Sequence, residues 1–261
     1  MKKTNALYSI INFTSIIAVI IVNGLANSLP INGIQTGEVS RKFETLFTPT
    51  GFTFSIWGII YVGLIFFGFY GFKFYRKATI SIVYKLKQSI LTANILNISW
   101  ILLWHHILIG PSVMVMLLLL FNLLFINLTI HTFRHKVKNK SQYFWFVRLP
   151  YGIYLGWILV ATIANISIYL TYIQWSGFGL LPQFWLAVVL ITGCAISLFM
   201  FLKYRIIGLS IAVIWGYFGV AYNLQFKGED QILIFLTYAL SILIFSVSIF
   251  KLFFFKPNRD R

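Results

Sequence analysis

Residues 150–170 read PYGIYLGWILVATIANISIYL and contain no charged side chain. A helix needs about 20 apolar residues to cross the hydrocarbon core of a bilayer, so this segment alone predicts a membrane-spanning helix. Further windows of similar length and polarity occur along the 261 residues. The sequence therefore predicts eight spans, at about residues 6–26, 52–72, 89–109, 112–130, 150–170, 184–202, 207–223 and 232–254.

The composition excludes an ordinary soluble enzyme. Hydrophobic residues make up 59% of the chain and charged residues 10%, whereas soluble domains average about 25% charged residues. No basic face is evident on which the net charge of +16 would bind nucleic acid, so no nucleic-acid partner is expected. The single cysteine, Cys194, excludes an intrachain disulfide and a cysteine metal cluster. We expect an all-α, polytopic helix bundle in the lipid bilayer.

The basic residues test the number of spans independently. Eighteen of the 21 Lys and Arg fall in the N-terminal segment, in the second, fourth and sixth connections and in the tail. The alternate connections hold only Arg41, Lys42 and Lys227. Because basic residues accumulate on the cytoplasmic side, this alternation predicts eight spans with both termini in the cytoplasm, in a multi-pass protein of the cell membrane.

The first span has a second interpretation. The two lysines before it and the small residues 24–26 also fit a cleaved signal peptide. Its long apolar stretch carries Asn12, Ser15 and Asn23, which suit a helix packed inside a bundle. We therefore favour a permanent helix.

The longest connection, residues 27–51, is a candidate lid. A connection of this length in a compact bundle is usually a lid, a binding loop or disordered. A solvated tether is the alternative, but Ile31, Phe43, Leu46 and Phe47 are apolar enough to pack back onto the bundle. We expect the connection to cover one end of the helices.

No acidic residue lies inside a predicted span, and this limits the chemistry. Proton relays and ion-coupled transporters usually need carboxylates at membrane depth. His131 and His135 lack a third metal ligand, and His105 and His106 are expected at the membrane interface, so no metal or cofactor is expected. An enzyme would have to use a tryptophan for redox or photochemical work. The acids outside the spans are Glu38, Glu44, Glu229, Asp230 and Asp260.

The spans do hold aromatic and amide side chains at helical spacing, and these should face inward because an unpaired polar group in hydrocarbon costs several kcal/mol. Two interpretations stay open. The side chains hydrogen-bond between helices, with Gly152 and Gly156 allowing close packing, or they line an apolar cavity for a flat ring. They fall on three predicted helices: Trp57 and Tyr61; Asn97 and Trp100; and Trp157, Ala161 and Asn165.

Three motifs in this order resemble the TspO/MBR family, the tryptophan-rich sensory and translocator proteins. Residues 49–61 (PTGFTFSIWGIIY) are similar to the family's proline–aromatic–Phe segment ending in W-x-x-x-Y. Residues 96–100 (LNISW) match L-N-x-x-W, and residues 157–165 (WILVATIAN) match W-x-x-x-A-T-x-x-N. The resemblance covers about residues 5–172. Ser112 and Met116 stand where the family has a tryptophan and an acidic residue.

The resemblance implies a five-helix bundle around a pocket for tetrapyrroles, sterols and synthetic aromatic ligands, and it allows for a homodimer. Residues 1–172 would form this TspO-like bundle, and residues 173–261 would add three transmembrane helices and a basic cytoplasmic tail. Family members act as sensors, as transporters or in porphyrin breakdown. The motif residues implied to surround the pocket are Trp57, Tyr61, Asn97, Trp100, Trp157, Ala161 and Asn165.

We therefore expect a membrane receptor or transporter, rather than an enzyme, that binds a hydrophobic ring-containing small molecule such as a tetrapyrrole or a sterol-like lipid. Trp57, Trp100 and Trp157 would supply aromatic walls, and Asn97 and Asn165 directional hydrogen bonds. The alternative is a membrane carrier for another lipid-like or small polar solute that uses all eight helices.

Overall fold

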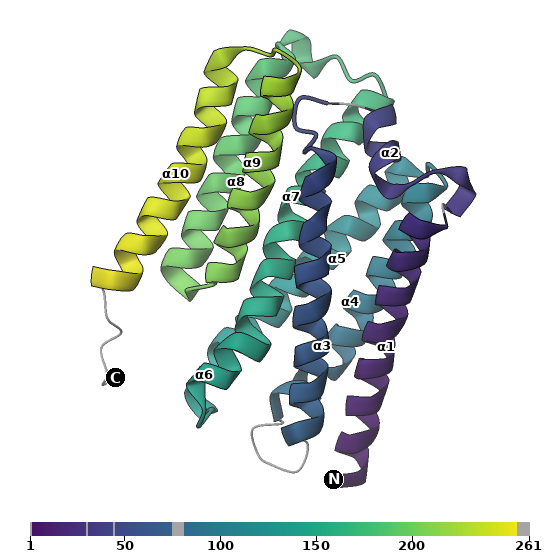
Figure 1. Ribbon diagram of the computed structural model, residues 1–261, viewed down its shortest axis with the longest axis vertical. Helices are drawn as coiled ribbons and strands as arrows, with labels where there is room; N and C mark the ends of the chain where they lie inside the picture. The colour runs from purple at the N-terminus through teal and green to yellow at the C-terminus, as the bar shows by residue number, and fades with distance from the viewer. Residues whose placement is uncertain (1, 30, 44, 75–80, 255–261) are drawn as a thin grey trace.

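The computed structural model describes residues 2–29, 31–43, 45–74 and 81–254. Within these ranges the chain is all α-helical, without strands, as expected, and the long helices run alternately up and down (Figure 1). They are α1 (Lys2–Ser28), α3 (Ile56–Phe74), α4 (Ser81–His105), α5 (Ile109–Phe133), α7 (Leu149–Tyr172), α8 (Pro182–Tyr204), α9 (Ile207–Phe226) and α10 (Gln231–Phe254).

Short helical turns occupy several connections. Because the long helices alternate in direction, α1 begins and α10 ends toward the same end of the bundle, the lower end in Figure 1. The connection from α1 to α3 covers the opposite end. The short elements are η1 (Ile31–Gly33), α2 (Thr36–Lys42), η2 (Gly51–Ser55), η4 (Arg134–Lys136), α6 (Lys140–Tyr143), η5 (Phe144–Arg148) and η6 (Gly177–Gly179).

Among the described residues, seven helices are long and apolar enough to cross a membrane: every long helix except α4. At 25 residues, α4 is as long as α5. Its hydropathy is lower because it carries Lys85 and Lys87 in its first turns and Asn94 and Asn97 in its middle. The structure is thus a multi-pass helix bundle. The sequence predicts eight spans, and the additional one corresponds to α4.

The second predicted connection, with its basic residues between 73 and 87, is helical in its second half, because α4 already begins at Ser81. Lys87 is accommodated on the helix by aromatic rings: its Nζ lies 3.9 Å from the ring centroid of Tyr8 and 4.0 Å from that of Tyr84. Such cation–π contacts stabilise an ammonium group beside apolar surface. Other basic residues expected on the cytoplasmic side are described incompletely. For Lys2, Lys3 and Lys73 only the backbone is described. Those outside the described residues are Arg76, Lys77, Lys256, Arg259 and Arg261.

α7 packs closely against α9. Residues 150–160 of α7 are all buried. A Cβ atom added to Gly156 would collide with the carbonyl oxygen of Leu209, and one added to Gly152 would lie 3.1 Å from the Cα atom of Gly208. Small residues allow such close approach of membrane helices. The close-packing surface expected at these two glycines therefore faces the C-terminal part of the chain.

Gly156→Ala is expected to lower the melting temperature of the purified protein in detergent, because the added methyl group would push the backbone of α9 away. Overpacking of this kind typically costs about 1–3 kcal/mol. Gly58→Ala in α3 is the matched control, because nothing lies within 4 Å of a Cβ added there. Equal melting temperatures for the two variants would contradict the close contact between α7 and α9.

Candidate functional site

An apolar cavity, here called the aromatic cavity, lies beneath the connection from α1 to α3. It contains about 520 Å³ of empty space, part of which is open to the outside. Side chains of η2 and α3, α4 and α7 form its walls, and residues of the first connection cover it. The lining residues are Ser40, Thr48, Pro49, Phe54, Trp57, Trp100, Trp104, Trp157, Val160, Ala161, Ala164, Asn165 and Ile168.

Five of the seven residues predicted to surround a ligand line this cavity: Trp57, Trp100, Trp157, Ala161 and Asn165. They come from three helices that are far apart in the sequence. Inward-facing polar and aromatic positions, chosen by helical spacing, are therefore brought together by the fold.

Aromatic rings pack against one another around the cavity. The ring centroids of Trp57 and Trp157 are 6.5 Å apart at an interplanar angle of 86°, and those of Phe54 and Trp157 are 5.8 Å apart at 83°. Trp104 stacks on Trp100 at 5.5 Å. Edge-to-face and offset-stacked pairs are the favoured arrangements of aromatic side chains. Trp104 and Phe54 were not among the predicted site residues, although Trp104 lies one helical turn from Trp100 and shares its face.

The carboxamide of Asn165 is used within the protein. Trp100 Nε1 donates to Asn165 Oδ1 at 3.0 Å, and Asn165 Nδ2 donates to Ser112 Oγ at 3.0 Å. The Ser112 hydroxyl in turn donates to the carbonyl oxygen of Ile109 at 2.7 Å. Asn165 therefore fixes the position of the Trp100 ring in the cavity wall.

Tyr61 and Asn97 are not among the residues that line the cavity. Tyr61 stacks on Trp57 with ring centroids 5.4 Å apart. Asn97 is fully buried, accepts a hydrogen bond from Asn23 Nδ2 at 2.8 Å and donates one to Tyr154 Oη at 2.9 Å. These bonds join α1, α4 and α7, so the geometry of Asn97 fits the packing interpretation.

The indole of Trp157 differs from those of Trp100 and Trp104. Trp157 is only 2% exposed, and its N–H has no acceptor among the described residues. Leaving a buried donor unpaired costs about 1–3 kcal/mol. An acceptor atom that enters the cavity and reaches this N–H would remove that cost.

The first connection is held from one side by the end of α4. The carbonyl oxygen of Thr36 accepts a hydrogen bond from Trp104 Nε1 at 3.1 Å, and Thr36 Oγ1 lies 2.9 Å from His105 Nε2. Asn32 Nδ2 donates to the carbonyl oxygen of His105 at 3.1 Å. His105 is fully buried, and its ring is an anchor for the connection at this end of the bundle.

α9 holds the same connection from the other side. Trp215 Nε1 donates to the carbonyl oxygen of Thr53 at 2.8 Å, and Asn223 Nδ2 donates to that of Thr48 at 2.8 Å. The backbone N–H of Thr50 also donates to α9. The expectation that this connection packs back onto the bundle is confirmed, and residues 48–53 form a roof segment attached to α9.

No carboxylate belongs to the described lining of the cavity. Glu38 lies in α2, and Glu229 and Asp230 lie in the turn between α9 and α10. Glu44 and Asp260 lie outside the described residues. The described lining offers aromatic rings, apolar side chains and the indole N–H of Trp157.

A family model described as TSPO-like protein matches residues 9–250. The match includes α8, α9 and most of α10, and so extends beyond the residues that the three sequence motifs covered. No curated protein and no solved structure matches the chain.

Trp215→Phe is expected to loosen the roof segment while keeping the aromatic ring. Loss of one hydrogen bond costs about 0.5–1.5 kcal/mol, which would speed amide hydrogen exchange in a peptide spanning residues 45–55 by up to about tenfold. Hydrogen-exchange mass spectrometry measures this directly. Trp145→Phe is the control, because Trp145 is exposed and lies toward the other end of the bundle. Equal exchange in the two variants would argue against an anchoring role for Trp215.

Proposed function

The chain belongs to the TSPO-like family, and from that premise we propose that its aromatic cavity binds a hydrophobic, ring-containing small molecule such as a tetrapyrrole or a sterol-like lipid. The observation that carries the proposal is the meeting of Trp57, Trp100 and Trp157 in one apolar cavity. Sites for small molecules have mostly apolar walls and a few polar anchors. Flat rings gain stacking and edge contacts against tryptophan.

The unpaired indole N–H of Trp157 narrows the class of ligand. It is a hydrogen-bond donor, so the bound molecule should carry an acceptor such as a carbonyl, a carboxylate or a ring nitrogen. Asn165 acts indirectly in this proposal, because its amide already holds Trp100 and Ser112. Tyr61 and Asn97 act indirectly as well: Tyr61 stacks on Trp57, and Asn97 donates a hydrogen bond to Tyr154.

The enclosed part of the aromatic cavity is small, about 40 Å³, whereas pockets that hold small molecules enclose about 300–1,000 Å³. Binding of a ring-containing ligand therefore requires the cavity to widen. A large planar ring would require the roof segment or the wall side chains to move outward. The attachment of the roof segment to α9 would then regulate access.

The proposed topology has eight spans, with α4 as the eighth. Its buried polar residues are hydrogen-bonded to other elements, so a helix of lower hydropathy can be covered by its neighbours. The basic residues assign both termini to the cytoplasm and the aromatic cavity to the opposite side of the cell membrane. In this arrangement the protein is a receptor or transporter in the bilayer.

A carrier that uses all eight helices is the second candidate function. The bonds from Asn223 and Trp215 to the roof segment favour it, because they attach α9 to the cover of a cavity whose walls come from earlier helices. Uptake of a labelled ring compound into proteoliposomes would favour a carrier. Saturable binding without uptake would favour a receptor.

Titration of the purified protein with protoporphyrin IX is expected to quench tryptophan fluorescence saturably. Trp157→Phe keeps a ring in the wall but removes the indole donor, so it should raise the dissociation constant by up to about tenfold, as expected for the loss of one hydrogen bond. Trp145→Phe removes an exposed tryptophan and should leave the constant unchanged. Quenching that does not saturate and is the same in all three proteins would contradict the site.

A further inference from the structure

One polar side chain of the aromatic cavity is not used by the protein itself. Ser40 lies in α2, the helix of the first connection, and belongs to the cavity lining. It is only 8% exposed, and its hydroxyl has no hydrogen-bond partner among the described residues. A hydroxyl can donate one hydrogen bond and accept two. Ser40 therefore offers both kinds of hydrogen bond to a molecule in the cavity.

The position of Ser40 over the cavity is fixed by its own helix. Thr36, Val39 and Ser40 form the buried side of α2, as expected for residues three and four positions apart. One turn before Ser40, the carbonyl oxygen of Thr36 accepts a hydrogen bond from Trp104 Nε1 at 3.1 Å. The Thr36 hydroxyl lies 2.9 Å from His105 Nε2. The end of α4 thus holds α2 with Ser40 on the side of the helix that lines the cavity.

The other polar side chains of the lining are engaged within the protein or can only donate. The Thr48 hydroxyl accepts a hydrogen bond from the backbone N–H of Thr45 at 3.0 Å and lies 3.2 Å from the Thr45 hydroxyl. Both ends of the Asn165 amide are hydrogen-bonded to other side chains. The remaining polar groups are indole N–H groups, which donate but cannot accept. Ser40 is therefore the side chain of the described lining best suited to accept a hydrogen bond from a ligand.

The ligand group that meets Ser40 should be uncharged. No Lys, Arg or His belongs to the described lining. Arg41 and Lys42, which follow Ser40, lie on the exposed side of α2. A carboxylate beside Ser40 would therefore be buried without a counter-ion, which is strongly unfavourable. A hydroxyl or carbonyl group avoids this penalty, and a ligand with carboxylates would keep them in the open part of the cavity.

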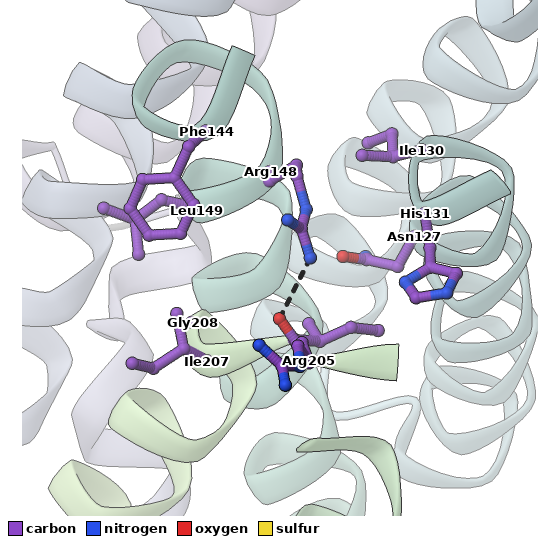
Figure 2. Close-up of a pocket in the computed structure, with 10 residues that line it drawn as sticks. Asn127, Ile130, His131, Phe144, Arg148, Leu149, Arg205, Ile207 and Gly208 are labelled. Carbon is purple, nitrogen blue, oxygen red and sulfur yellow. Dashed lines mark hydrogen bonds between the residues drawn. The ribbon is translucent and has the colours of Figure 1, made fainter. Parts of the chain in front are cut away.

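A smaller pocket between α5, α7 and the α8–α9 turn provides a contrast (Figure 2). It encloses only about 10 Å³, about the minimum for one water molecule. Arg148 Nη2 donates there to the carbonyl oxygen of Arg205 at 3.1 Å, and His131 Nδ1 donates to that of Tyr204 at 2.6 Å. These polar side chains connect the ends of helices, whereas the hydroxyl of Ser40 has no such partner among the described residues.

We propose that Ser40 forms a hydrogen bond with an uncharged hydroxyl or carbonyl group of the ligand in the aromatic cavity. The cavity would then prefer ring alcohols and ring ketones to ring hydrocarbons of the same shape. This inference rests on the proposed function, because it needs a ring-containing ligand in the cavity. Since Ser40 lies in α2, a ligand bonded to it is also attached to the cover of the cavity.

The test compares 1-pyrenemethanol with 1-methylpyrene, two flat probes of nearly the same shape that differ by one hydroxyl group. Each is titrated into the purified full-length protein in detergent, and saturable energy transfer from tryptophan to pyrene reports binding. The measured quantity is the ratio of the two affinities, alcohol to hydrocarbon, each corrected for partition into empty detergent micelles. Ser40→Ala is expected to lower this ratio by up to about tenfold, as for the loss of one hydrogen bond. The affinity for 1-methylpyrene should stay the same, which would show that the cavity of the variant is intact.

Ser176→Ala is the matched control, because Ser176 is exposed in the connection from α7 to α8 and is not among the lining residues. It should leave the ratio unchanged. Saturable binding of both probes with the same ratio in the wild type and in Ser40→Ala would overturn the role of Ser40 but not the ring site. An equal fall of the ratio in both serine variants would overturn it too. Failure of both probes to bind saturably to the wild-type protein would contradict the ring site itself, and this inference with it.

Discussion

Polar side chains on α4 must find hydrogen-bond partners inside the protein, because an unpaired amide or indole in hydrocarbon costs several kcal/mol. Asn94 donates to Ser15 of α1, Asn97 bonds to α1 and α7, and Trp100 donates to Asn165 of α7. These bonds connect α4 to α1 and to α7. Together they fix the rotation of α4, and thereby determine which of its tryptophans face the aromatic cavity.

The aromatic cavity follows from this arrangement. The polar groups that are satisfied within the protein, those of Trp100 and Asn165, form a rigid wall. The indole N–H of Trp157 is left without a partner among the described residues and is the group best suited to a ligand. α9 completes the site because it packs against α7 and holds the roof segment. The C-terminal helices therefore contribute to the same structural unit as the first five, in agreement with a family match that runs to residue 250.

Hydrophobic windows and helical spacing predict the all-α bundle and the inward-facing tryptophans, because both follow from local periodicity. The role of Asn97 could not be predicted in this way, since an inward-facing carboxamide serves equally well as an interhelical bond or a ligand anchor. Its partner Asn23 is distant in the sequence. The sequence also does not reveal that Trp215 and Asn223 anchor the roof segment. Their acceptors are backbone carbonyl oxygens, which every residue carries. The helical position of Lys87 was also hidden, since one of the two tyrosine rings that its ammonium group contacts lies on α1.

Thiol protection tests most directly the central claim that the cavity beneath the roof segment is the binding site. The only cysteine, Cys194, is buried in α8 and would be changed to alanine. In that background Ala164→Cys places a thiol in the cavity lining, and Ile95→Cys places one on an exposed position of α4. A saturating concentration of protoporphyrin IX is predicted to slow maleimide labelling at position 164 and to leave labelling at position 95 unchanged. Equal labelling rates at position 164 with and without the porphyrin would contradict the account.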